Sequence, residues 1–121
     1  MKKKVLIVDD APEIVEILED LIESAGYQAF SSPDAEKALE MIPHNRPDLI
    51  LLDLLLPRMS GAEFARKMKV DESTKTIPII IVSVLKKDDR KNEGLEKVSD
   101  DYIEKPFEPK DLLNHVKRFL A

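Results

Sequence analysis

Three short runs of the chain are apolar at every position: Val5–Val8, Leu49–Leu52 and Ile79–Val82. They are rich in Val, Ile and Leu and do not alternate with polar residues, a pattern typical of strands that are covered on both faces in a parallel sheet. Two weaker segments, Tyr27–Ser31 and Asp101–Glu104, are candidates for edge strands. The hydrophobic pattern therefore predicts five strands, three of which are buried on both faces.

The segments between these strands have the periodicity and the end signals of helices. Pro12–Ala25 places apolar residues on one face at helical spacing, and Gly26 follows it as a natural stop. Ser32-Pro33 predicts the N-cap and first position of a second helix, because serine caps helices and proline suits the first turn. Ser60-Gly61-Ala62-Glu63 has the pattern of a capping box at the start of a third helix.

The last two expected helices differ in their apolar face. Pro109 opens a final helix with apolar residues on one side, whereas Lys87–Lys97 is mostly charged and offers little apolar surface. Strands and helices thus alternate along the chain, and this order predicts a parallel sheet with helices on both faces. The 121 residues fit a single domain, 1–121, with an ordinary globular apolar fraction of 43%.

Composition removes several classes of site and partner. The chain has no cysteine and only two histidines, His44 and His115, which excludes disulfides, thiolate catalysis and a histidine-rich metal site. The formal net charge of −5 argues against a dedicated nucleic-acid binder. The apolar run after the N-terminal lysines is too short for a secretory signal, and no stretch approaches the about 20 apolar residues of a membrane span. We therefore expect a cytoplasmic protein without direct contact to nucleic acid or membrane.

Polar residues stand where the predicted strands end. They are Asp9 and Asp10 after the first strand, Asp53 after the third, Ser83 after the fourth and Lys105 after the fifth. The carboxyl ends of parallel strands share one edge of the sheet, where the ligands of open α/β sheets bind, so we expect these residues to meet in one cleft. Each residue type is common in loops by itself, and the prediction depends on their joint occurrence.

The predicted cleft has an excess of negative charge. Three carboxylates about 4 Å apart repel by about 1–4 kcal/mol per pair at effective dielectric constants of about 80 to 20. A hard divalent cation such as Mg2+ suits this cluster, and Lys105 supplies a further positive charge. A metal ion, carboxylates, a hydroxyl and an ammonium are the groups needed for phosphoryl transfer to an aspartate. In this interpretation Asp53 is the nucleophile, and Asp9 and Asp10 hold the metal ion. Lys105 and Ser83 bind the phosphoryl oxygens.

Together these motifs resemble a known family. The segments that carry the resemblance are Val5–Asp10, Asp48–Pro57, Ser60-Gly61, Ile77–Ser83 and Asp100–Phe107. In register and spacing they are similar to the receiver domain of two-component response regulators, over essentially the whole chain. The resemblance implies an α/β, doubly wound (flavodoxin-like) five-stranded parallel sheet of order 2-1-3-4-5, with five helices on two faces.

The resemblance also implies roles for the acids. Asp53 matches the phosphorylated aspartate of the family. Asp10 matches the direct ligand of Mg2+ or Mn2+, and Asp9 matches the acid that acts through a water. The backbone carbonyl of Leu55 lies where the family completes its metal site.

Four further residues match the family's lysine and its switch. Lys105 matches the lysine that pairs with the acids and then with the phosphoryl group. The bond between that lysine and the next proline, here Lys105–Pro106, is usually cis. Ser83 matches the switch hydroxyl, and Tyr102 the aromatic residue whose ring turns inward when the hydroxyl follows the phosphate.

Several positions depart from the family pattern. Val84 stands where alanine or glycine is usual, and its branched side chain would crowd the phosphoryl site and slow phosphotransfer or hydrolysis. Val98-Ser99 replaces a frequent Gly-Ala pair, which would reshape that loop. Leu55 and Leu85 are apolar where many relatives are polar. We predict that they shield the acyl phosphate from water and lengthen its lifetime.

The surface formed by the fourth helix, fifth strand and fifth helix is the expected output surface. The helix expected at Lys87–Lys97 has few apolar anchors, so we expect it at the low-stability end of the fold, where a phosphate can shift it. Some family members dimerise on this face through charged pairs. That set is matched by Lys91 and Asp101 but not by Glu93 and His115, so we expect a monomer or a weak dimer.

The favoured function is a signalling receiver rather than an enzyme, with a histidine kinase or a histidine phosphotransfer protein as donor and a protein as downstream target. One alternative is a receiver-like adaptor that binds a partner without phosphorylation, although an adaptor has no need of the acidic cluster. A flavodoxin-like cofactor binder is disfavoured, because Asp9-Asp10-Ala11-Pro12 offers acids and no glycine where a phosphate would bind. The chain is expected to be a stand-alone regulator or a piece of a longer one.

Overall fold

The computed structural model describes residues 1–86 and 94–120. Its strands pair in parallel in the order β2-β1-β3-β4-β5, as a doubly wound sheet requires. The strands are β1 (Lys4–Val8), β2 (Gln28–Ser32), β3 (Leu49–Leu52), β4 (Ile79–Ser83) and β5 (Asp101–Glu104). The expected fold class and strand order are thereby confirmed.

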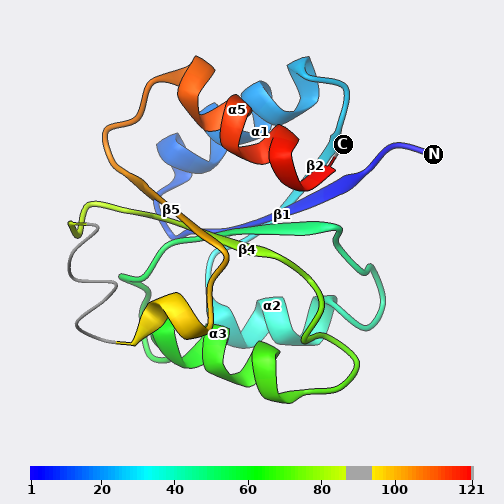
Figure 1. The fold of residues 1–121 in the computed structure, drawn as a ribbon, viewed down its shortest axis with the longest axis vertical. Helices are drawn as coiled ribbons and strands as arrows, with labels where there is room; N and C mark the ends of the chain where they lie inside the picture. Colours follow the sequence, from blue (N-terminus) through cyan, green and yellow to red (C-terminus); the bar gives the residue numbers. More distant parts are fainter. Residues whose placement is uncertain (87–93, 121) are drawn as a thin grey trace.

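Helices cover both faces of the sheet (Figure 1). On one face lie α1 (Pro12–Ser24) and α5 (Pro109–Leu120), and on the other α2 (Ala35–Met41) and α3 (Gly61–Val70). The described residues thus contain four α-helices, whereas five were expected. Most of the expected helix at Lys87–Lys97 falls on residues 87–93, outside the described part, and its end, Leu95–Lys97, forms a 3-10 helix (η1).

Two apolar cores flank the sheet because successive side chains of a strand point to opposite faces. In β1, Val5 and Ile7 pack with residues of α1 and α5, whereas Leu6 and Val8 pack with residues of α2 and α3. All four of these β1 side chains are fully buried. A strand with helices on both sides has no polar face, which explains the unbroken apolar runs of the sequence.

The second helix begins later than the sequence predicted. Its N-cap is Asp34, whose Oδ1 accepts a hydrogen bond from the Lys37 N–H at 2.7 Å. Ser32 was expected in this role but ends β2, and its Oγ donates to the Asp34 carbonyl at 2.8 Å. The prediction was wrong because the local sequence offers two capping residues two positions apart, and strand pairing occupies the first.

The second strand is displaced by one residue from the expected Tyr27–Ser31. The Tyr27 N–H donates to the Ile22 carbonyl at 3.2 Å, so this residue still belongs to the turn that ends α1. Gly26 makes that turn possible with a φ of 93°, a left-handed value that glycine adopts without strain.

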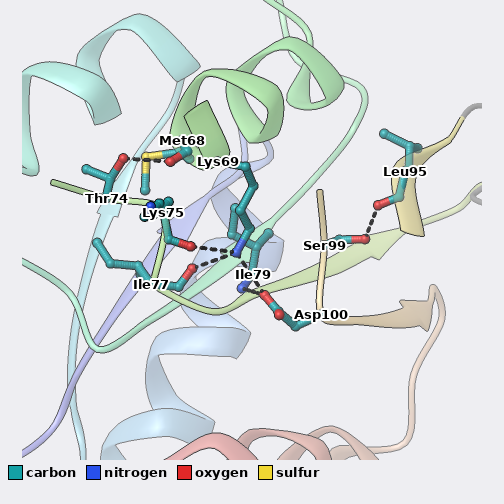
Figure 2. Close-up of polar contacts among 9 residues, drawn as sticks. All are labelled: Met68, Lys69, Thr74, Lys75, Ile77, Ile79, Leu95, Ser99 and Asp100. Atoms are coloured by element: carbon teal, nitrogen blue, oxygen red, sulfur yellow. Dashed lines mark hydrogen bonds and ion pairs between the residues drawn. The ribbon is translucent and has the colours of Figure 1, made fainter. Parts of the chain in front are cut away.

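The amino ends of β4 and β5 are tied to α3 by one lysine (Figure 2). Lys69 Nζ lies 3.1 Å from both the Ile77 carbonyl and Asp100 Oδ2, and 3.5 Å from the Lys75 carbonyl. The same Asp100 oxygen accepts a hydrogen bond from the Ile79 N–H at 2.8 Å. These contacts stabilise the amino edge of the sheet. The polar residues of the candidate site lie at the opposite, carboxyl edge.

Candidate phosphoacceptor site

The acids that follow β1 and β3 lie together at the carboxyl edge of the sheet. Val8 pairs with Leu52, and the Asp53 N–H continues this pairing by donating to the Val8 carbonyl at 2.9 Å. One oxygen each from Asp9, Asp10 and Asp53 lies within 4.8 Å of the others. Asp9 and Asp53 are buried, with 3% and 8% exposure, whereas Asp10 is exposed to solvent.

Lys105 reaches this cluster from the end of β5. Its Nζ lies 2.8 Å from Asp9 Oδ2 and 3.4 Å from Asp53 Oδ2, and only 11% of its side chain is exposed. The backbone holds it there, because the Lys105 N–H donates to the Ser83 carbonyl at 2.8 Å. The peptide bond between Lys105 and Pro106 is cis. One ammonium therefore contacts two of the three carboxylates, and the four groups together carry a formal charge of −2.

The Asp53 carboxyl has competing electrostatic influences. Burial raises its pKa above the usual range, and the Asp9 carboxylate acts in the same direction. Lys105 lowers the Asp53 pKa, as does the Leu55 N–H, which donates to Asp53 Oδ1 at 3.3 Å. A buried carboxylate with an adjacent ammonium and an adjacent acid is a group that a bound cation would stabilise in its charged form.

Ser83 and Tyr102 are linked through the backbone of Leu85. Ser83 is fully buried, and its Oγ accepts a hydrogen bond from the Leu85 N–H at 3.4 Å. The Tyr102 hydroxyl donates to the Leu85 carbonyl at 2.5 Å, and the residue is only 4% exposed, so the ring points inward. Because β3 and β4 pair Leu52 with Ile81, Ser83 stands on the strand next to Asp53 at the same edge.

Apolar residues follow the site residues along the chain, with Leu55 two positions after Asp53 and Val84 and Leu85 directly after Ser83. Leu55 and Val84 are 53% and 59% exposed, and Leu85 is half-buried. Val84 is thus largely exposed, and its crowding of the phosphoryl site stays a prediction. The backbone of Leu55 is fixed beside Asp53 by the hydrogen bond from its own N–H.

A glycine that sequence reasoning left without a role shapes the loop after Asp53. The Gly61 N–H donates to the Leu54 carbonyl at 3.0 Å. A Cβ at position 61 would lie 2.2 Å from the Asp53 carbonyl oxygen, closer than real Cβ contacts allow. The available signal was a glycine at the first position of a helix, where propensity alone favours other residues.

The acidic cluster suits a hard divalent cation. Its donors are carboxylate oxygens alone, and among the described residues it is the one group of three potential metal-ligating side chains. Oxygen ligands and one or two direct carboxylates are what Mg2+ prefers in proteins, often with waters and phosphate oxygens completing the shell. Because the cluster stays negative even with the Lys105 ammonium beside it, binding of a metal cation is electrostatically favoured.

Fold and site together define a class of protein: a doubly wound α/β domain with an acidic cluster and a lysine at the carboxyl edge of its sheet. The chain belongs to the response regulator receiver domain family, whose family model matches residues 5–117. Receiver domains of this family act in two-component signalling.

Individual relatives agree with the family assignment. The chain is 44% identical over 118 residues to the phosphate regulon transcriptional regulatory protein PhoB of Pseudomonas aeruginosa, covering 98% of this chain and 52% of that protein. It is 36% identical over 120 residues to the alkaline phosphatase synthesis transcriptional regulatory protein PhoP of Bacillus subtilis, covering 99% and 49%. The chain thus spans about half the length of these curated relatives.

A solved structure of similar size shares the fold closely. The chemotaxis protein CheY4 of Vibrio cholerae superposes with a TM-score of 0.91 at 30% identity, covering 99% of this chain and 100% of that one.

Among the described residues, no helix combines the length and apolar character that crossing a membrane requires.

Proposed function

We propose that this chain accepts a phosphoryl group on Asp53 from a phosphohistidine. A carboxylate oxygen of Asp53 attacks phosphorus, the new P–O bond forms, the P–N bond breaks, and the imidazole leaves with the electron pair and takes up a proton. The observation that carries this proposal is the contact of Lys105 with both Asp9 and Asp53, at 2.8 and 3.4 Å, inside an acidic cluster. The ammonium can follow the negative charge from the carboxylates to the phosphoryl oxygens.

A divalent cation, Mg2+ or Mn2+, would be held by Asp9, Asp10 and Asp53, with the backbone carbonyl of Leu55 as a further ligand. When bound, it neutralises negative charge on the transferring group. Asp10 is exposed and makes the site accessible from solvent, whereas burial of Asp9 and Asp53 keeps their side chains in place. Lys105 orients Asp9 from the other side through the 2.8 Å ion pair.

The switch we propose runs from Ser83 to Tyr102. A phosphoryl oxygen offers the Ser83 hydroxyl a charged acceptor, and movement of the hydroxyl toward it would lengthen the weak 3.4 Å hydrogen bond that its oxygen accepts from the Leu85 N–H. Movement of the Ser83–Leu85 segment would change the hydrogen bond between the Leu85 carbonyl and the Tyr102 hydroxyl. Tyr102 lies on β5, so a change at the phosphate would reach the described part of the expected output surface, which consists of η1, β5 and α5.

The donor we propose is a histidine kinase or a histidine phosphotransfer protein, and the target is a further protein. The named relatives are transcriptional regulators of about twice this length, so DNA contact in such proteins need not involve the receiver part. A formal net charge of −5 supports a receiver that does not itself bind nucleic acid. We also propose a cytoplasmic location, consistent with a cytoplasmic phosphodonor, and a monomer or weak dimer.

A receiver-like adaptor without phosphorylation is the second candidate. It is disfavoured because Asp9 and Asp53 are both buried beside a single ammonium, so one buried negative charge is left uncompensated unless the site binds a cation. An adaptor surface gains nothing from this arrangement.

The test is incubation with acetyl phosphate and Mg2+ followed by intact-mass measurement. We expect wild type to gain one phosphoryl group and Asp53→Asn to gain none. Omission of Mg2+, or its removal with a chelator, should reduce the gain in wild type by at least about 10-fold, because charge neutralisation is lost. Phosphorylation of Asp53→Asn to the wild-type level would contradict the assignment.

A further inference from the structure

The loop of residues 54–60, which joins Asp53 to α3, contains a strained backbone position. Arg58 has a φ of 62°, the one positive φ of a residue other than glycine within the described ranges 1–86 and 94–120. For a residue other than glycine, the left-handed conformation is less stable than the right-handed one by about 1–2 kcal/mol. Strain of this kind persists only where neighbouring contacts hold the residue in place.

Those contacts come from the Arg58 guanidinium. Its NH2 nitrogen lies 3.0 Å from Asp34 Oδ2, and its Nε lies 3.3 Å from Glu36 Oε2. Asp34 uses its other oxygen to cap α2, where it accepts from the Lys37 N–H. One guanidinium therefore ties the loop of residues 54–60 to the first turn of α2.

Water reaches the two ion pairs unequally, because 62% of the Arg58 side chain and 40% of the Glu36 side chain are exposed, against 18% for Asp34. Glu36 nevertheless has one oxygen that water does not reach. Its Oε1 is buried without a hydrogen-bond partner among the described residues, while its Oε2 faces Arg58. A buried carboxylate oxygen without a partner is unfavourable, and the adjacent guanidinium is the compensating charge. Loss of Arg58 would leave Asp34 and Glu36 both negative and two positions apart.

The contacts continue from Asp34 back to the acidic cluster. The Ser32 hydroxyl donates to the Asp34 carbonyl at 2.8 Å, and the Ser32 carbonyl accepts from the Asp9 N–H at 3.2 Å. Lys105 in turn joins Asp9 to Asp53. A closed circuit of contacts thus runs from Asp53 through its loop to Arg58, along the end of β2 to Asp9, and back.

We propose that Arg58 is a positioning residue for the phosphoacceptor site. By holding the loop of residues 54–60 against α2, it fixes the backbone of Leu55 and the side chain of Asp53 for cation binding and phosphotransfer. The cation and phosphoryl parts of this inference rest on the proposed function, whereas the ordering of the loop does not.

Positioning and simple charge predict opposite effects on cation affinity. Arg58 is positive, so a neutral replacement would strengthen binding of Mg2+ to the acidic cluster if only long-range charge mattered. If Arg58 positions the loop, the same replacement weakens binding. Because the two predictions differ in sign, one titration separates them.

The test compares Arg58→Met and Arg58→Asn with Arg118→Met. Asparagine tolerates the left-handed backbone but cannot make the ion pairs, and Arg118 is an exposed arginine of α5 whose loss removes the same charge elsewhere. We expect both Arg58 variants to raise the Mg2+ dissociation constant about three- to tenfold. This is less than the roughly 10–100-fold typical of residues that contact metal ligands directly. Arg118→Met should leave it unchanged.

A readout without metal or phosphate tests the ordering itself. The amide N–H groups of Leu56 and Gly61 both donate to the Leu54 carbonyl, at 3.2 and 3.0 Å. In metal-free protein we expect their hydrogen exchange to be about tenfold faster in the Arg58 variants, with the Ile50 and Ile80 amides unchanged. Asp34→Asn, which keeps a capping oxygen, should reproduce the effect and should not add to Arg58→Met in the double variant.

Three results would overturn the inference: tighter Mg2+ binding by Arg58→Met, wild-type binding and exchange in Arg58→Asn, or additive effects in the double variant. If wild type failed to accept phosphate while the exchange and Mg2+ results held, the proposed function would fall and the positioning role would stand.

Discussion

Gly61 is required where it stands because α3 begins against the backbone that follows β3. A Cβ there would lie 2.2 Å from the Asp53 carbonyl oxygen and 2.7 Å from the Leu54 Cα. Both atoms belong to the backbone, so neither can move without moving the loop that carries Asp53. The glycine thus couples the start of a helix to the position of the candidate phosphoacceptor.

Gly61→Ala should therefore lower both stability and phosphotransfer. We expect a loss of about 1–3 kcal/mol in the free energy of unfolding, as for other overpacked sites. Denaturant unfolding and the rate of phosphorylation by acetyl phosphate measure the two effects. The control is Gly26→Ala, where nothing lies within 4 Å but φ is 93°. Gly26→Ala should lower the free energy of unfolding by about 1–2 kcal/mol through backbone strain alone, and it should keep the wild-type rate of phosphorylation.

Leu55 and Leu85 bear on the lifetime of the proposed acyl phosphate. A polar side chain at position 55 could orient a water for attack on phosphorus, whereas leucine cannot hydrogen-bond it. We expect Leu55→Asn to hydrolyse its phosphate at least about threefold faster, short of the roughly 100-fold of a positioned general base. Mass measurement of the phosphorylated fraction over time checks this, with Ile17→Asn as a similarly exposed control, 47% against 53%. An unchanged or longer lifetime in Leu55→Asn would remove the shielding explanation.

At the residue scale, the acids of the site could be predicted from the sequence because the ends of apolar strands are easy to recognise. Asp9, Asp10 and Asp53 each follow an apolar run directly, and the structure brings their oxygens within 4.8 Å. Arg58 could not be found in this way. Its partner Glu36 stands 22 residues away, and a left-handed φ at an arginine leaves no mark in the sequence.

At the scale of elements, α1 carries an acidic ridge. Burial raises the pKa of Glu19, and Glu23, Asp20 and Glu16 raise it further. A carboxyl whose pKa is raised by folding destabilises the folded state once it is ionised. The unfavourable contribution is therefore absent well below the ordinary value of 4.5 and develops as pH rises above it.

Glu23→Gln should stabilise the protein by about 0.2–0.5 kcal/mol near neutral pH, because a like-charge pair four positions apart is removed. The gain should disappear near pH 3, because the raised pKa of Glu19 leaves that carboxyl protonated there and the like-charge repulsion is lost. Denaturant unfolding at the two pH values measures it. Glu13→Gln is the contrasting variant: Glu13 lies in the first turn, where negative charge is favourable, so the same change should destabilise. Equal effects of the two substitutions would contradict this account.

Element boundaries were predictable where a signal was unambiguous. Gly26 and Ser60 marked a helix end and a helix start correctly, since the Ser60 hydroxyl accepts from the Glu63 N–H at 3.1 Å. The start of α2 was missed because Ser32 and Asp34 both suit a cap, and pairing of β2 with β1 decides between them. Tertiary pairing is information that a local sequence window does not contain.

At the scale of the whole molecule, cation binding should act as a stabiliser. A ligand that binds the folded state alone adds RT ln(1 + [L]/Kd), about 2.7 kcal/mol at 100 times the dissociation constant. We expect the melting temperature of wild type to rise with Mg2+ concentration. Asp10→Asn should lose most of this rise, because Asp10 is exposed and its loss leaves the core intact. Calorimetry measures it, and a full Mg2+ response in Asp10→Asn would exclude that side chain as a ligand.

The parallel α/β architecture could be predicted from the sequence, because apolar runs alternate with amphipathic segments along the whole chain. The strand order could not: it came from the family resemblance, because alternation alone permits other orders of the same strands. The described structure agrees with it, from β2 at one edge to β5 at the other.

The contact of Lys105 with Asp53 spans 52 positions of the chain, and that with Asp9 spans 96. A ribosome therefore releases all three acids well before the lysine that offsets their charge. Until the lysine is made, Asp9 and Asp53 lack the ammonium that lies beside them in the folded domain. The positive charge that lies beside the cluster is thus supplied by a segment made long after the acids themselves.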